Sequence, residues 1–201
     1  MRIGIDFDNT IVSYDALFHQ VALEKQLISP TLSKSKLAVR DYLRENDKED
    51  LWTLMQGEVY GSRMGDAIAY PGFFKFAKQA QEYGHHIFII SHKTRYPFAG
   101  PKYDLHQAAK NWVNKFMTLN DIALNENTDA FFEITKEDKI SRIFQLNCDI
   151  FIDDLPEILA MPGFPDNTQK ILFDFEGMHP INHSQFTNAN SWQHIQDLII
   201  K

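Results

Sequence analysis

The sequence predicts an α/β protein, a three-layer sandwich in which helices cover a central, mainly parallel sheet, with a small helical cap inserted into it. Short apolar runs that end abruptly at polar residues occur three times, at residues 3–7, 86–91 and 149–154. Runs of this length are typical of strands that are buried on both faces. Helical patterns separate them, and such alternation is typical of a parallel sheet with right-handed crossovers.

Weaker signals complete the pattern. Strands are expected at 130–134 and 170–175, and a helix at 73–84, because it follows Pro71-Gly72 and ends at a glycine. Residues 105–117 have helical composition, and Thr135, with Asp138 three residues on, offers a cap for the next helix. The Asn/His-rich segment 177–190 is expected to be a surface loop before a last short helix at 192–200.

Residues 12–70 do not alternate in this way. They contain several polar helical patterns with a break around Ser29-Pro30. We therefore expect a catalytic core made of residues 1–11 and 71–201, like the core of a Rossmann-like fold, and a helical cap insertion at 12–70.

Composition limits the function classes. The chain has 201 residues and a net charge of −7, with a sequence pI near 5.6, which argues against broad binding to nucleic acid or an anionic membrane. Its single cysteine, Cys148, cannot form an internal disulfide, and no apolar run approaches membrane-spanning length. The first carboxylate, at position 6, comes too early for a signal peptide, so a cytoplasmic location is expected.

Two carboxylates, Asp6 and Asp8, lie at the end of the first predicted strand. An extended chain would send them to opposite faces, so the chain must turn there if both serve one site. Phosphoryl transfer needs a nucleophilic oxygen and a proton donor for the leaving group, and this pair can supply both. Taken alone, the two acids are equally consistent with a helix cap or a surface turn.

A second acidic pair, Asp153-Asp154, ends another buried run. Carboxylates that approached Asp6 would repel it unless a cation lay between them. Magnesium is the natural choice, because it prefers oxygen ligands and commonly binds one or two carboxylates together with a substrate phosphate. The alternative is that the pair caps a helix announced by Leu155-Pro156-Glu157.

Three further residues have the right positions to hold a phosphate. Ser91 ends the 86–91 run, where its hydroxyl and adjacent N–H could bind a phosphate oxygen. Lys139 and, less surely, Lys136 lie one helical turn apart and could balance negative charge at the same place. The alternatives are a plain turn serine and solvated lysines.

In this order the residues resemble the haloacid dehalogenase-like (HAD) hydrolase superfamily, in its phosphatase-type form with a small helical cap between the first two motifs. Its phosphatases have a D-x-D-x-T motif, a strand-ending Ser or Thr, a Lys and a late acidic pair, which correspond here to 6–10, Ser91, Lys139 and Asp153-Asp154. The match runs from Met1 to about Phe175. Only the first motif is specific by itself.

The resemblance implies a mechanism. Asp6 would form an aspartyl-phosphate, and Asp8 would protonate the leaving oxygen and then activate water. Ser91 and Lys139 (less surely Lys136) would hold the phosphoryl group, and Thr10 would support the turn at the phosphate site. His92, which follows Ser91 directly, is a further candidate for phosphate binding. Magnesium would be bound by Asp6, the backbone carbonyl of Asp8 and Asp154, with Asp153 acting through water. An acid at position 8 disfavours carbon–halogen cleavage, and the insertion would close over the substrate.

The expected substrate is a small phosphomonoester, a sugar phosphate or similar metabolite. Lys93 and Arg95, which follow Ser91, are candidate substrate contacts, and Arg40, Arg44 and Arg63 in the cap are further ones. A 5′-nucleotidase-type phosphatase, a phosphomutase and a non-catalytic HAD-like binding protein are the alternatives. His85 and His86 lie at the opposite end of their strand from Ser91, and we interpret them as structural. The phenylalanines at 73, 74 and 76 are expected to be core residues.

Overall fold

A computed structural model describes residues 1–125, 129–179 and 185–200. The chain divides into two compact units. The first, here called the sheet unit, contains Met1–Val12, Ala69–Lys93 and Val113–Lys201. The second, the helical unit, contains Ser13–Ile68 and Thr94–Trp112.

The sheet unit is built on a parallel sheet of six strands within the described residues, in the order β5-β4-β1-β6-β7-β8. The strands are β1 (Arg2–Ile5), β4 (His86–His92), β5 (Ala130–Glu133), β6 (Ile150–Asp153), β7 (Gln169–Phe173) and β8 (Thr187–Ala189). The three strongest strand predictions correspond to β1, β4 and β6, which lie side by side. They are apolar along their length because both faces of a parallel sheet are covered.

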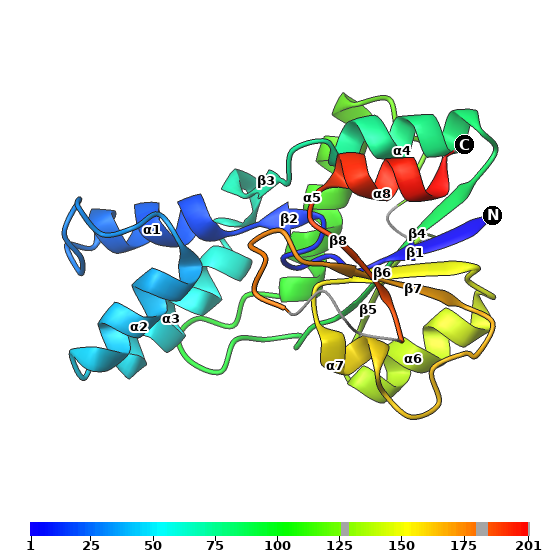
Figure 1. Cartoon of the computed structure of the whole chain (residues 1–201). Helices are drawn as coiled ribbons and strands as arrows, with labels where there is room; N and C mark the ends of the chain where they lie inside the picture. The colour runs from blue at the N-terminus through cyan, green and yellow to red at the C-terminus, as the bar shows by residue number, and fades with distance from the viewer. Residues whose placement is uncertain (126–128, 180–184, 201) are drawn as a thin grey trace. The chain divides into compact units, whose positions relative to one another are not determined.

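Helices cover both faces of this sheet, as Figure 1 shows. The helices α4 (Phe73–Glu82) and α8 (Trp192–Ile199) lie on one face, and α6 (Lys136–Gln145) and α7 (Pro156–Leu159) lie on the other. The rings of Phe73 and Phe76 pack 5.0 Å from that of Trp192, and all three side chains are fully buried. Phe73 and Phe76 are therefore core residues, as predicted, while Phe74 is only partly buried. The three-layer α/β fold is confirmed.

Two helices begin where the sequence predicts. Gly72 precedes α4 with a φ of 89°, a left-handed conformation that glycine adopts without strain. The hydroxyl of Thr135 accepts a hydrogen bond from the backbone N–H of Asp138 at 3.0 Å and so caps α6.

One segment differs from the prediction. Thr187–Ala189, within the expected loop 177–190, forms the edge strand β8 beside β7; part of that segment, 180–184, lies outside the described residues. Three residues with two polar side chains carry no strand pattern. Their extended conformation comes from pairing with the exposed edge of β7, which is a tertiary effect.

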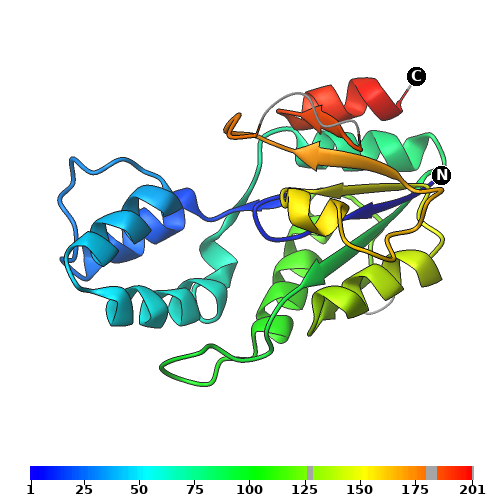
Figure 2. The ribbon, with the colours of Figure 1, turned by 60° about the horizontal axis from the view of Figure 1, so that its bottom comes forward.

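The helical unit contains α1 (Asp15–Glu24), α2 (Lys36–Glu45) and α3 (Glu49–Tyr60), followed by the short 3-10 helix Met64–Asp66. Figure 2 shows that α1, α2 and α3 pack against one another. In their core the ring of Phe18 stacks on Trp52 at 4.6 Å and meets Tyr60 edge-on at 5.6 Å.

This unit includes Thr94–Trp112 as well as the helices predicted at 12–70. A Cβ atom at Gly57 in α3 would lie 2.9 Å from the Cβ of Pro97, so this glycine permits close packing of the 94–112 segment on α3. The helix α5 (Leu105–Leu119) begins in the helical unit and ends in the sheet unit. The chain passes between the two units at two further places, within β2 (Val12–Ser13) and within β3 (Ile68–Ala69). These two strands pair with each other.

Within the part of the chain that the structure describes, no helix has the length and apolar character needed to cross a lipid bilayer.

Candidate active site

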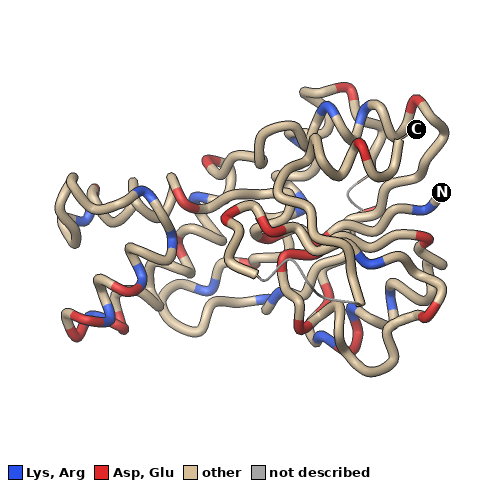
Figure 3. Tube along the Cα trace, in the orientation of Figure 1, with Lys and Arg blue, Asp and Glu red and all other residues tan. Residues whose placement is uncertain are grey.

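The carboxyl ends of β1, β4 and β6 bring three predicted site segments together in the sheet unit. Asp6 follows β1 directly, Ser91 is the penultimate residue of β4, and Asp153 is the last residue of β6. Because β1 lies between β4 and β6 in the sheet, these residues meet at its centre. Ligands of open α/β sheets bind at this edge, where strand order reverses. Figure 3 shows acidic residues gathered there.

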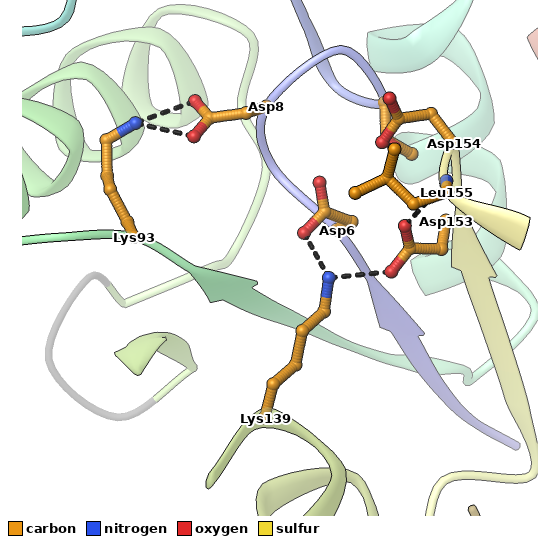
Figure 4. Close-up of polar contacts among 8 residues, drawn as sticks. Asp6, Asp8, Lys93, Lys139, Asp153, Asp154 and Leu155 are labelled. Atoms are coloured by element: carbon orange, nitrogen blue, oxygen red, sulfur yellow. Dashed lines mark hydrogen bonds and ion pairs between the residues drawn. The ribbon is translucent and has the colours of Figure 1, made fainter. Parts of the chain in front are cut away.

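The chain turns immediately after Asp6, as predicted. The backbone N–H of Asp6 donates to the carbonyl of Ile152 at 2.9 Å, which continues the pairing with β6. The N–H groups of Ile11 and Val12 then both donate to the carbonyl of Phe7, and Asn9 has a φ of 57°. Asn tolerates this left-handed conformation better than most residues. The turn takes Asp8 out of the line of the strand (Figure 4).

Lys139, on α6, connects the two acidic segments. Its Nζ lies 2.5 Å from Oδ1 of Asp6 and 2.6 Å from Oδ2 of Asp153, and all three side chains are nearly or fully buried. A buried ammonium requires such partners, because no water is there to solvate it. Lys136, one turn earlier, is partly exposed, and its ammonium lies 3.8 Å from the carboxylate of Glu157. The contact to Asp6 therefore comes from Lys139.

The two buried carboxylates, Asp6 and Asp153, have raised pKa values. Burial raises the pKa of Asp6 to about 7; Lys139 opposes this, and the charges of Asp153 and Asp8 add to it. Burial also raises the pKa of Asp153, again opposed by Lys139. For Lys139, burial lowers the pKa but the two carboxylates outweigh it, so that its pKa lies above the ordinary value. For both carboxylates, burial therefore outweighs the stabilisation that Lys139 gives to the charged form.

Asp6, Asp153 and Asp154 each direct a carboxylate oxygen to one place, and these oxygens all lie within 4.8 Å of one another. A set of carboxylate oxygens is the donor chemistry that magnesium prefers. Oδ1 of Asp154 also accepts a hydrogen bond of 3.3 Å from the hydroxyl of the fully buried Thr10. The residues present thus fit a divalent cation with hard oxygen ligands.

Ser91 and His92 line the same end of β4. Ser91 is 1% exposed, and its Oγ has no hydrogen-bond partner among the described residues. A buried hydroxyl left unpaired is unusual, and it is explained if a ligand completes its hydrogen bonding. His92 is partly buried, and burial lowers its pKa, with Lys139 and Lys136 adding to the effect.

Lys93 has a partner that sequence reasoning missed. Its Nζ lies 2.8 and 2.6 Å from the two carboxylate oxygens of Asp8 (Figure 4). Lys93 lies two residues beyond Ser91, just as Asp8 lies two residues beyond Asp6. This shared spacing does not by itself predict that the two residues meet across neighbouring strands.

The arginines proposed as substrate contacts form ion pairs within the helical unit. Within the helical unit, Arg95 pairs with Asp104 at 3.1 Å and Arg63 with Glu24 at 2.7 Å. Arg40 and Arg44 pair with Asp41 and Glu49. In the sheet unit, Nε2 of His86 lies 3.0 Å from Asp129, at the start of β4 and away from Ser91, which agrees with a structural role.

Comparison with known proteins gives consistent results. No family model matches the chain. A protein of Oceanobacillus iheyensis named "Putative nucleotidase" is 27% identical over 171 residues, which is 79% of each chain. A Clostridium acetobutylicum structure described as a "predicted phosphatase" has a TM-score of 0.57 at 15% identity, covering 99% of this chain and 97% of its own.

Two further structures are described as HAD hydrolases. One, from Ehrlichia chaffeensis, has a TM-score of 0.55 at 13% identity and covers 98% and 95% of the two chains. The other, from Bacillus subtilis and bound to magnesium, has a TM-score of 0.54 at 12% identity and covers 100% and 98%. The sheet order, the acidic strand ends and these likenesses agree. The chain therefore shares its fold with solved structures of haloacid dehalogenase-like hydrolases.

Proposed function

We propose that this protein is a magnesium-dependent phosphohydrolase that cleaves a small phosphomonoester through an aspartyl-phosphate on Asp6. The observation that carries the proposal is the convergence of Asp6, Asp153 and Asp154 on one place, beside the ammonium of Lys139. The unpaired hydroxyl of Ser91 supports it, because a phosphate oxygen would complete its hydrogen bonding.

The roles follow from position. A carboxylate oxygen of Asp6 attacks phosphorus, and the leaving oxygen takes a proton from Asp8. Ser91, His92 and Lys139 orient the phosphoryl group, and Thr10 orients Asp154 by the hydrogen bond to its carboxylate. Asp6, the Asp8 carbonyl and Asp154 would hold magnesium, with Asp153 acting through water. The ion would offset the negative charge that phosphate adds to the acidic site.

The helical unit is the proposed cap over the substrate, and Arg95 is a proposed substrate contact. The proposed compartment is the cytoplasm, which fits the single cysteine. A nucleotidase-type phosphatase is the second candidate, and the Oceanobacillus relative favours it. Sugar phosphates and nucleoside monophosphates should therefore be assayed side by side.

The decisive test is hydrolysis of p-nitrophenyl phosphate. We expect turnover with magnesium that disappears with a chelator and in Asp6→Asn. Asp121→Asn is the matched control, because the side chain of Asp121 is 87% exposed and its left-handed backbone suits asparagine. A wild-type protein inert towards a broad panel of phosphomonoesters would overturn the proposal in favour of a binding protein. A phosphomutase would return the phosphoryl group to substrate without stoichiometric release of phosphate.

A further inference from the structure

The pairing of Lys93 with Asp8 is a second cation–carboxylate contact, separate from that of Lys139 with Asp6 and Asp153. The side chain of Lys93 is 5% exposed and that of Asp8 is 23% exposed. Lys93 is held at its place by the backbone, because its N–H donates to the carbonyl of Glu133 at 2.8 Å and so extends the pairing of β4 with β5. The backbone of Lys93 is therefore held beside the end of β5.

Both oxygens of Asp8 accept from this ammonium, at 2.8 and 2.6 Å. Two hydrogen bonds to one carboxyl group restrict its orientation more than a single bond would. Figure 4 shows Asp8 directed to Lys93 while Asp6 is directed to Lys139. The contact thus fixes the orientation of the Asp8 side chain.

From this geometry we infer that Lys93 is a positioning residue that holds Asp8 for the hydrolysis of the phosphoenzyme. The inference rests on the proposed function. In that step a water oxygen bonds to phosphorus, Asp8 takes a proton from the water, and the bond between phosphorus and the Asp6 oxygen breaks. Free phosphate and the Asp6 carboxylate result, so atoms and charge balance.

Hydrolysis of the phosphoenzyme is also the step that separates a phosphatase from a phosphomutase. If Asp8 is held at the edge of the sheet, it can take a proton from the attacking water. If Asp8 is displaced, that proton transfer is slowed and the phosphoenzyme becomes long-lived. Misplacement of a catalytic group by about 1 Å costs roughly 10²-fold in rate.

The test uses p-nitrophenyl phosphate in stopped-flow, because its leaving group departs without needing a proton. In Lys93→Met we expect a burst approaching one p-nitrophenolate per enzyme, followed by a steady rate about 10²-fold below that of the wild type. Asp8→Asn should give the same pattern, and adding Lys93→Met to it should slow the steady rate no further. Lys93→Arg should restore part of the rate.

Lys170→Met is the matched control, since its Nζ donates to the carbonyl of Leu159 beside the amino end of β7, and no burst is expected. Thermal unfolding of Lys93→Met and Lys93→Gln with chelator checks that the variants fold. A raised KM at unchanged kcat, a slowed burst, or unchanged kinetics would each overturn the inference. Wild-type protein without turnover would instead refute the proposed function. Turnover by the wild type is therefore measured before any variant is compared.

Discussion

The ammonium of Lys139 lies 2.5 Å from the carboxylate of Asp6, although the two residues are 133 positions apart in the chain. Asp6 begins the turn after β1, and Lys139 lies in the second turn of α6, on one face of the sheet. The contact therefore exists only when β1 and α6 have packed. The same ion pair thus belongs both to the packed interior and to the proposed active site.

Replacing Lys139 by Met should destabilise the protein strongly. It leaves the buried Asp6 and Asp153 carboxylates without their common partner, and breaking a buried ion pair costs about 3–5 kcal/mol. For a chain of this size that corresponds to a fall in Tm of roughly 10 °C, measurable by calorimetry with chelator present. Magnesium should restore part of the loss.

Lys136→Met is the control for that experiment. Lys136 is 41% exposed and lies 3.8 Å from a solvent-exposed Glu157, so its loss should change Tm by little. Equal effects of the two substitutions would contradict the assignment of Lys139 to the site.

Asp6→Asn should abolish turnover and, without metal, raise stability at neutral pH. The pKa of Asp6 is raised to about 7 in the fold, against an ordinary value near 3.8, so the folded state favours the protonated carboxyl. This contribution to stability is complete below about pH 4 and is lost as pH rises towards 7. Urea unfolding at pH 7.5 with chelator checks this prediction, and a variant less stable than the wild type would contradict it.

Ser91→Ala should lower activity with little change in stability. The hydroxyl is buried but unpaired, so its removal breaks no hydrogen bond in the described structure. If it donates to the transferring phosphoryl group, kcat should fall roughly 10²-fold. Steady-state kinetics and a melting curve on the same preparation measure both quantities, with Ser141→Ala on α6 as the control. A Ser91→Ala variant with wild-type kcat would contradict the role of Ser91 in phosphate binding.

Cys148 should resist alkylation in the folded protein. Burial raises the pKa of its thiol to about 12, so that the reactive thiolate is scarce. Iodoacetamide at pH 8.5 should modify the protein only after unfolding by guanidinium, as followed by mass spectrometry. Because the unfolded thiol has the lower pKa, the stability it contributes is present below about pH 9 and declines as pH rises towards 12.

Local signals were sufficient for most of the sheet unit. The runs around β1, β4 and β6 are continuous apolar segments, and the starts of α4 and α6 depend on Gly72 and Thr135 through short-range geometry. The edge strand β8 was missed, because its extended backbone comes from pairing with β7 and not from its three residues. The place of 94–112 in the helical unit was missed because its packing on Gly57 is equally non-local.

The amino-acid sequence by itself determined the candidate site's residue types and their positions at strand ends, since hydrophobic runs that stop at Asp6, Ser91 and Asp153 are local properties. Only the tertiary structure decided which lysine meets which carboxylate. Lys139 faces Asp6 and Asp153, Lys93 holds Asp8, and Lys136 lies outside near Glu157. The physical reason is that an ion pair across 85 or 133 residues depends on strand order and burial, which no short stretch of chain encodes.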